Sequence, residues 1–109
     1  MNQPAPASAP SRIPYVAEAP TLPLVVVIPT YNEARYIADV VRRTLKHVPV
    51  VVIDDGSSDG SGGAAALAGA KVITLKINQG KGKALNTGFD YAVARGVDAA
   101  ITLDADGQH

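Results

Sequence analysis

Short apolar runs alternate along the chain with segments that have the periodicity of helices. The runs cover residues 24–28, 50–53, 71–75 and 99–103. The first run consists mostly of β-branched residues in unbroken series, which is typical of a strand buried on both faces of a sheet. We therefore predict four strands.

Three helices are predicted between these strands. In the first, apolar residues recur every three or four positions from Ile37 to Val48, and Asn32 is expected to cap its start. The second, at residues 64–70, is predicted to be weak because of its glycines. The third covers residues 81–95, and Gly96 is expected to end it.

This alternation of strands and helices, with short connections, predicts an α/β fold. Right-handed crossovers give a Rossmann-like parallel sheet with helices on both faces. In such sheets ligands bind beyond the carboxyl ends of the strands. The segments that follow the four strands carry nearly every unusual residue of the chain and should form one rim; they are residues 29–33, 54–59, 76–83 and 104–109.

Length and proline content set the domain organisation. The 109 residues have room for one domain, which we place at residues 24–109. Residues 1–23 hold six of the eight prolines and are expected to form a disordered tail. The tail lacks the basic start and apolar stretch of a signal peptide. The run at 24–28 is far shorter than the ~20 residues of a transmembrane helix, so we expect no transmembrane segment in this chain.

Charge and cysteine content narrow the function classes. Ten basic and ten acidic residues give a formal net charge of zero, so no global field favours nucleic acid as a partner. The absence of cysteine excludes disulfides and thiolate metal sites. These features fit a cytoplasmic protein, with the inner face of the membrane as the alternative location for the full-length protein.

Asp104 and Asp106 are the strongest chemical signal in the sequence. They follow the fourth strand directly and are separated by one residue, so both can turn toward the same small volume. Hard oxygen ligands of this kind suit Mg²⁺ or Mn²⁺. A polar turn after the strand is the alternative. An EF-hand loop is excluded, because it needs a third oxygen ligand and then a distant glutamate, and the chain stops at His109.

Asp54 and Asp55 open a second acidic stretch, residues 54–60. The stretch could be no more than a loop and helix cap, since Asp, Ser and Gly favour such positions. Alternatively, one of the two carboxylates accepts a hydrogen bond from a ring N–H of a nucleotide base. Two further aspartates have structural interpretations. Asp59 is expected to be a helix cap, and Asp90 a solvated position on a helix.

The segment around Lys81 also has two interpretations. It could be an ordinary solvated helix start. Alternatively, Gly80 and Gly82 let the backbone approach a pyrophosphate, with lysine charge nearby. A Walker A loop is excluded, because no Ser or Thr follows the lysine at the required spacing.

Four motifs stand on the predicted rim. They are residues 29–33 (PTYNE), 53–60 (IDDGSSDG), 78–88 (NQGKGKALNTG) and 104–109 (DADGQH). Together they resemble family 2 glycosyltransferases, and most nearly the dolichyl- or polyprenyl-phosphate mannose and glucose synthase branch. The resemblance covers residues 24–109. It implies the N-terminal, nucleotide-binding half of an A-type glycosyltransferase fold, with Mg²⁺ or Mn²⁺ as cofactor.

The resemblance also implies two sets of site residues. Residues expected to bind the nucleotide sugar are Pro29, Tyr31, Glu33, Ile53, Asp55, Asp104, Ala105 and Asp106. Residues expected to hold the metal are Asp104, Asp106 and Gln108. Within the first set, Ile53 and Asp55 would contact the base.

Substrates are implied in the same way. The donor would be a UDP- or GDP-hexose, and the acceptor a polyprenyl or other lipid phosphate, or a growing glycan. Complete members of the family continue for at least as many residues again. The acceptor site and the carboxylate base are therefore expected beyond His109, no catalytic residue is assigned, and this chain alone is expected to transfer no sugar.

Two other classes of protein also have acidic residues at the ends of their strands. A sugar-phosphate nucleotidylyltransferase shares the architecture and the metal requirement, but it is expected to carry a Gly-rich, Arg-containing loop after the first strand. Residues 29–33 contain no glycine. A receiver-type domain needs a lone aspartate after its third strand, which here ends in Leu75 and Lys76. Both remain as alternatives that the sequence disfavours.

Overall fold

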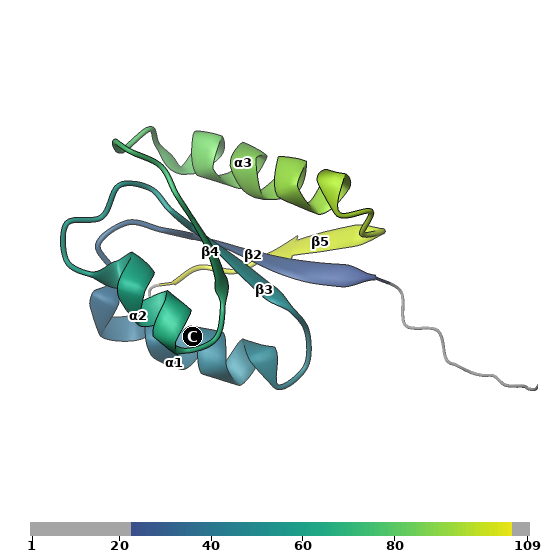
Figure 1. Cartoon of the computed structure of the whole chain (residues 1–109), viewed down its shortest axis with the longest axis horizontal. Coiled ribbons are helices and arrows are strands. Elements are labelled where there is room, and N and C mark those ends of the chain that lie inside the picture. The colour runs from purple at the N-terminus through teal and green to yellow at the C-terminus, as the bar shows by residue number, and fades with distance from the viewer. Residues whose placement is uncertain (1–22, 106–109) are drawn as a thin grey trace, which may run out of the picture.

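The computed structural model describes residues 23–105. Its strands are β2 (Leu24–Thr30), β3 (Val50–Asp54), β4 (Lys71–Thr74) and β5 (Ala99–Thr102). Its helices are α1 (Ala34–Leu45), α2 (Ser61–Leu67) and α3 (Lys81–Ala94). All strand pairs are parallel and the sheet order is β4-β3-β2-β5, as Figure 1 shows. The predicted α/β fold with a parallel sheet is confirmed.

The strand register aligns the carboxyl ends of the strands. Thr30, the last residue of β2, pairs with Asp54, which in turn pairs with Thr74. On the other side of β2, Val27 pairs with Thr102. Because all four strands run in one direction, the loops that follow them lie along one edge of the sheet. The predicted rim is therefore present in the described residues.

Helices cover both faces of the sheet, with α1 and α2 on one side and α3 on the other (Figure 1). Successive strand residues point to opposite faces. Side chains that pack toward α1 and α2 include Val26, Ile28, Val50 and Val52, and those that pack toward α3 include Val25, Val27, Val51 and Ile53. Each is at most 5% exposed. Burial of such a side chain stabilises the fold by about 1.5–3 kcal/mol.

Helix α2 begins earlier than the sequence predicts. It starts at Ser61 and includes Gly62 and Gly63, whereas the prediction placed a weak helix at 64–70. A Cβ at Gly62 would lie 2.5 Å from Asp54 Oδ2. The glycine that lowers helix propensity therefore allows the helix to lie close to the Asp54 carboxylate, and this close approach was missed. Strands β4 and β5 and helix α3 each end one residue earlier than predicted.

The start of β2 is joined to the start of β5. The carbonyl of Pro23 accepts a hydrogen bond from Asp98 N at 2.9 Å. The rest of the predicted tail lies outside the described residues, so its disorder and the boundary at residue 24 stay predictions. Within residues 23–105, no helix has both the length and the apolar character needed to cross a membrane.

Gly88 brings α3 into close contact with β2, because a Cβ there would collide with Val27 Cγ1. Since Val27 is fully buried, we expect Gly88→Ala to lower the free energy of unfolding by about 1–3 kcal/mol. Gly82→Ala in the same helix is the matched control, because nothing lies within 4 Å of a Cβ at that position. It should be neutral or stabilising by up to ~1 kcal/mol. Urea unfolding followed by circular dichroism measures both, and equal effects would contradict this packing.

Candidate functional site

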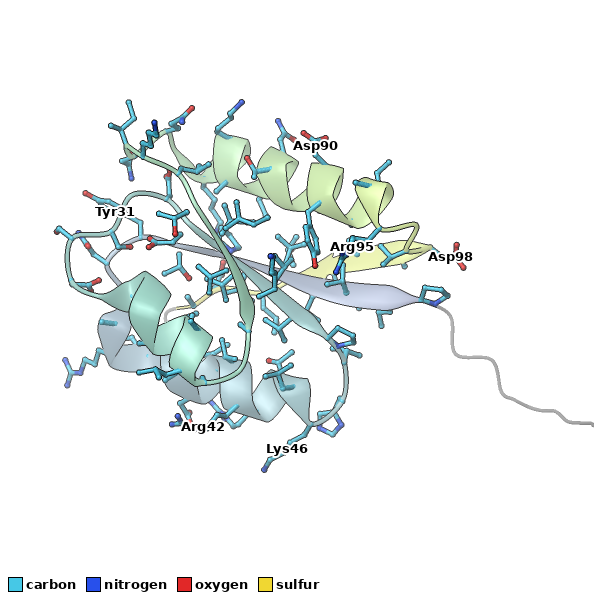
Figure 2. All side chains as sticks on the ribbon, in the orientation of Figure 1. Tyr31, Arg42, Lys46, Asp90, Arg95 and Asp98 are labelled. Carbon is cyan, nitrogen blue, oxygen red and sulfur yellow. The ribbon has the colours of Figure 1, made fainter. Side chains whose placement is uncertain are left out.

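A pocket of about 320 Å³ opens at the carboxyl edge of the sheet. The ends of β2 and β3, the start of α3 and the segment after β5 all contribute to it. Its lining residues are Pro29, Thr30, Tyr31, Glu33, Asp55, Asn78, Gly80, Lys81, Ala84, Asp104 and Ala105. Figure 2 shows Tyr31 at this edge of the molecule, whereas Lys46 and Asp98 lie toward the opposite edge.

The structure brings together most of the residues predicted to bind a nucleotide sugar. Those that line the pocket are Pro29, Tyr31, Glu33, Asp55, Asp104 and Ala105. Ile53 is fully buried and packs into the core on the α3 side of β3, so its side chain is not among the lining residues. Asp106 and Gln108 lie outside the described residues. The roles assigned to all of these residues stay predictions.

Asp55 fixes the loop that precedes α3. Its Oδ1 accepts a hydrogen bond from Gln79 N at 2.7 Å, and its Oδ2 accepts one from Gly80 N at 2.9 Å. The residue is 3% exposed. A carboxylate has about four acceptor positions, so Asp55 retains the capacity to accept a further hydrogen bond from a ligand in the pocket.

Asp54 has a structural role in its own loop. Its Oδ1 accepts a hydrogen bond from Ser57 N at 3.0 Å, and the residue is buried. Of the two interpretations of the acidic stretch, the loop-stabilising one therefore holds for Asp54. Asp55 is the carboxylate of the pair that lines the pocket.

Asn32 does not cap α1, contrary to the prediction. Its backbone is in the left-handed region, with φ of 53°, and Glu33 precedes the first helical residue. Asn32 N donates to Ser57 Oγ at 2.9 Å, and Asn32 Oδ1 accepts from Ser58 N at 2.9 Å. Asn tolerates this backbone conformation better than most residues. Asn32 thus joins the loop after β2 to the loop after β3.

Asp59 and Ser61 satisfy the first N–H groups of α1 from a distance of more than 20 residues in sequence. Glu33 N donates to Ser61 Oγ at 2.9 Å, and Ala34 N donates to Asp59 Oδ2 at 3.0 Å. Asp59 Oδ1 also accepts from Ser61 N at 3.0 Å. Asp59 therefore accepts the first N–H group of both helices, as a cap would, although the N-cap positions themselves are Glu33 and Gly60. The Ser61 hydroxyl first, and then the Ala34 N–H, lower the pKa of Asp59 below its ordinary value of 3.8. These bonds hold Glu33 at the pocket.

Lys81 and Asp104 form an ion pair across the pocket. Lys81 Nζ lies 2.8 Å from Asp104 Oδ1, with the two side chains 65% and 51% exposed. The pair connects the start of α3 with the segment after β5. Exposed pairs of this kind contribute only about 0–1 kcal/mol to stability.

The lining charges make the pocket anionic. Three carboxylates, those of Glu33, Asp55 and Asp104, face one ammonium, that of Lys81. A polyanionic ligand such as a nucleoside diphosphate therefore needs further positive charge in order to bind near Asp104.

Asp104 fits a hard divalent cation. Its carboxylate is half exposed, lines the pocket and already has a cationic group at hydrogen-bond distance. The other two predicted ligands, Asp106 and Gln108, lie beyond the described part of the chain. Within residues 23–105, no group of three or more His, Cys, Asp or Glu residues could hold a metal ion. The described residues thus supply one of the three predicted ligands.

Sequence reasoning missed part of the pocket. Thr30, Asn78 and Ala84 line it without having been assigned to it. The Thr30 hydroxyl is buried and has no hydrogen-bond partner among residues 23–105. Its position in the PTYNE motif was visible in the sequence, but the lack of a partner is visible only in the structure.

Comparison with known families decides the class of the protein. The sequence profile of the family described as Glycosyl transferase family 2 matches residues 25–109. The chain belongs to glycosyltransferase family 2. The resemblance of its four motifs is thereby confirmed, and the nucleotidylyltransferase and receiver-type alternatives receive no support.

Two curated relatives of this family 2 chain have names from the predicted branch. Polyprenol monophosphomannose synthase of Mycolicibacterium smegmatis is 38% identical over 99 residues, which cover 83% of this chain and 37% of that protein. Undecaprenyl-phosphate mannosyltransferase of Micrococcus luteus is 35% identical over 94 residues, covering 79% and 39%. The chain therefore spans less than two fifths of the length of these relatives.

Solved structures share the fold. Glucosyl-3-phosphoglycerate synthase from Mycobacterium tuberculosis, in complex with Mn²⁺, UDP and glucosyl-3-phosphoglycerate, is 26% identical with a TM-score of 0.63, over 75% of this chain and 33% of that one. The same enzyme with Mg²⁺ and UDP also matches with a TM-score of 0.63. The predicted A-type glycosyltransferase architecture is confirmed for this family 2 chain.

The Asp59 contacts generate a prediction about stability and pH. Asp59→Asn leaves one carbonyl oxygen where two carboxylate oxygens now accept bonds from α1 and α2, so it should lower the melting temperature at pH 7 and speed hydrogen exchange at Ala34 N. Because the folded-state pKa of Asp59 is depressed, its contribution is present above the unfolded pKa and is lost as the pH falls below about 4. The difference between wild type and variant should therefore shrink in acid.

Asp90→Asn is the matched control for this substitution, because Asp90 is exposed on α3 and points away from the sheet (Figure 2). It removes the same charge without touching the loop contacts. If the two variants had the same melting temperature at every pH, Asp59 would not stabilise the start of α1.

Proposed function

We propose that this chain forms the nucleotide-sugar-binding part of a glycosyltransferase that moves a hexose from a nucleoside diphosphate to a polyprenyl phosphate or a glycan acceptor. The observation that carries the proposal is the pocket at the carboxyl edge, where Tyr31, Glu33, Asp55 and Asp104 lie together in a family 2 chain.

The nucleoside would occupy the part of the pocket formed by the ends of β2 and β3. Tyr31 is 49% exposed and offers a ring on which a base can stack. Asp55, buried at the floor, would accept a hydrogen bond from the ring N–H of the base. Pro29 and Glu33 would line the rest of the nucleoside site. Ile53 would pack beneath this site from the core.

The diphosphate would lie toward α3 and the segment after β5. Asp104 would hold Mg²⁺ or Mn²⁺ together with Asp106 and Gln108, and Ala105 would lie beside the diphosphate. A divalent cation there stabilises the negative charge that develops on the departing nucleoside diphosphate. Lys81 supplies the only ammonium among the described lining residues and adds to the same stabilisation.

The relatives support a choice of acceptor class. Both named relatives are polyprenyl- or undecaprenyl-phosphate sugar enzymes, which favours a lipid phosphate over a glycan. A lipid-phosphate acceptor would place the full-length protein at the inner face of the membrane. The structures with UDP support a uridine nucleotide, and GDP is the alternative to be tested beside it.

Metal-dependent nucleotide binding tests this function. Calorimetry with UDP and GDP should show that Mn²⁺ strengthens nucleotide binding. Asp104→Asn should reduce this gain in affinity by at least about tenfold, because even substitutions next to metal ligands lower metal affinity by about 10–100-fold. Asp106→Asn should act in the same way, and Asp90→Asn should have no effect. Equal binding with and without Mn²⁺ in the folded wild type would mean that Asp104 and Asp106 belong only to a turn.

Asp55→Asn tests base recognition separately from metal dependence. The substitution removes the acceptor that we assign to the base and one of the two bonds to the loop before α3. We expect weaker nucleotide binding by about tenfold, the scale of one charge-assisted hydrogen bond. The ratio of affinities with and without Mn²⁺ should stay close to that of wild type, and a collapse of that ratio would contradict the assignment.

A further inference from the structure

Asn78 lines the pocket, and the proposed function gives it no role. It lies in the segment between β4 and α3 and is exposed. Its side-chain amide makes no hydrogen bond with any of residues 23–105. Such an amide has two donor hydrogens and a carbonyl acceptor. Asn78 therefore brings a hydrogen-bonding group to the pocket that is available to a ligand.

The backbone of Asn78 is held beside the loop that follows β3. The next two residues, Gln79 and Gly80, donate their N–H groups to the Asp55 carboxylate at 2.7 and 2.9 Å. On the other side lies Gly56, with φ of 77°, where a Cβ would come within 2.8 Å of Asn78 N. The backbones of the two loops therefore touch, and the position of Asn78 is tied to that of Asp55.

The order of the strands places Asn78 at one end of a bound nucleotide. The sheet order is β4-β3-β2-β5. In the proposed function the diphosphate lies beside Asp104, after β5, and the base lies at Asp55, after β3. A nucleotide in this direction would cross the end of β2 with its ribose and turn the far edge of its base toward β4. Asn78 follows β4 and lines the pocket there.

The chemistry of the base at that edge suits an amide donor. In uracil, the ring N–H assigned to Asp55 lies between two carbonyl groups, and the C4 carbonyl is the one farther from the ribose. In guanine, the C6 carbonyl lies next to the corresponding N–H. Cytosine and adenine have an amino group at this position and no ring N–H beside it. A carboxylate and an amide donor side by side would therefore select uracil or guanine.

We propose that Asn78 determines base specificity by donating a side-chain N–H to the carbonyl next to the ring N–H that Asp55 binds. This carbonyl is the C4 carbonyl of uracil or the C6 carbonyl of guanine. The inference rests on the proposed function. It adds to that function a second group that recognises the base, held in place by the first.

The test combines Asn78→Ala with the change of one atom in the ligand. Calorimetry compares UDP with 4-thio-UDP, and GDP with 6-thio-GDP, at one Mn²⁺ concentration and in mildly acidic buffer that retains the ring N–H. Sulfur accepts hydrogen bonds weakly, so wild type should bind the thio form of its preferred nucleotide about two- to tenfold more weakly, the range of one neutral hydrogen bond. Asn78→Ala should lose a similar factor for the oxygen form and should no longer distinguish the two forms.

Gln79→Ala is the matched control. Gln79 is the neighbouring exposed amide, but it is not among the lining residues, and its bond to Asp55 comes from the backbone and is retained. This variant should have the affinities and the discrimination of wild type. Thermal unfolding establishes that both variants are folded.

The possible failures are distinguishable. If wild type binds UDP or GDP and Asn78→Ala keeps the wild-type ratio between the oxygen and sulfur forms, Asn78 does not contact the carbonyl and only this inference is wrong. Loss of discrimination in Gln79→Ala as well would also overturn the inference, because the effect would then belong to the loop. If folded wild type binds neither nucleotide, the proposed function fails and the inference fails with it.

Discussion

The carboxylate of Asp55 joins the end of β3 to the beginning of α3. Its two oxygens accept hydrogen bonds from consecutive backbone groups, Gln79 N and Gly80 N; Asp55 itself is buried, and the two bonds are partly buried. Bonds from N–H groups to a carboxylate are stronger than neutral ones. They determine where α3 begins, and so they place Lys81 within reach of Asp104. One buried carboxylate thus holds the helix start from which Lys81 reaches the pocket.

The rim contains two kinds of polar contact. Asn32, Asp59 and Ser61 bind backbone N–H groups of neighbouring loops, which keeps Tyr31 and Glu33 in place without regular secondary structure. The Lys81–Asp104 pair, in contrast, is half exposed and links two charged side chains. The backbone of the pocket is therefore fixed by the first kind of contact, whereas the exposed ion pair adds little stability.

Much of the fold could be predicted from the sequence, because strand and helix periodicities are local properties. The parallel arrangement then followed from short crossovers, and it placed Asp55 and Asp104 at one edge. Contacts between loops could not be predicted in this way. Asn32 has the residue type of a helix cap, yet its partners are Ser57 and Ser58, which are about 25 residues away. The helical start of α2 was missed because Gly62 and Gly63 lower helix propensity, and the close approach to Asp54 that requires a glycine at position 62 is a tertiary contact.

We propose that a divalent cation and a nucleotide meet at the carboxyl edge of this sheet. Paramagnetic broadening by substoichiometric Mn²⁺ in the presence of UDP, with Mg²⁺ as the diamagnetic reference, tests it on the folded chain. We predict that the amide signals of Asp104, Ala105 and Lys81 broaden first and that those of Lys46 and Asp98, toward the opposite edge (Figure 2), broaden last. Broadening that is strongest around Lys46 or Asp98, or that does not decrease with distance from Asp104, would contradict this proposal.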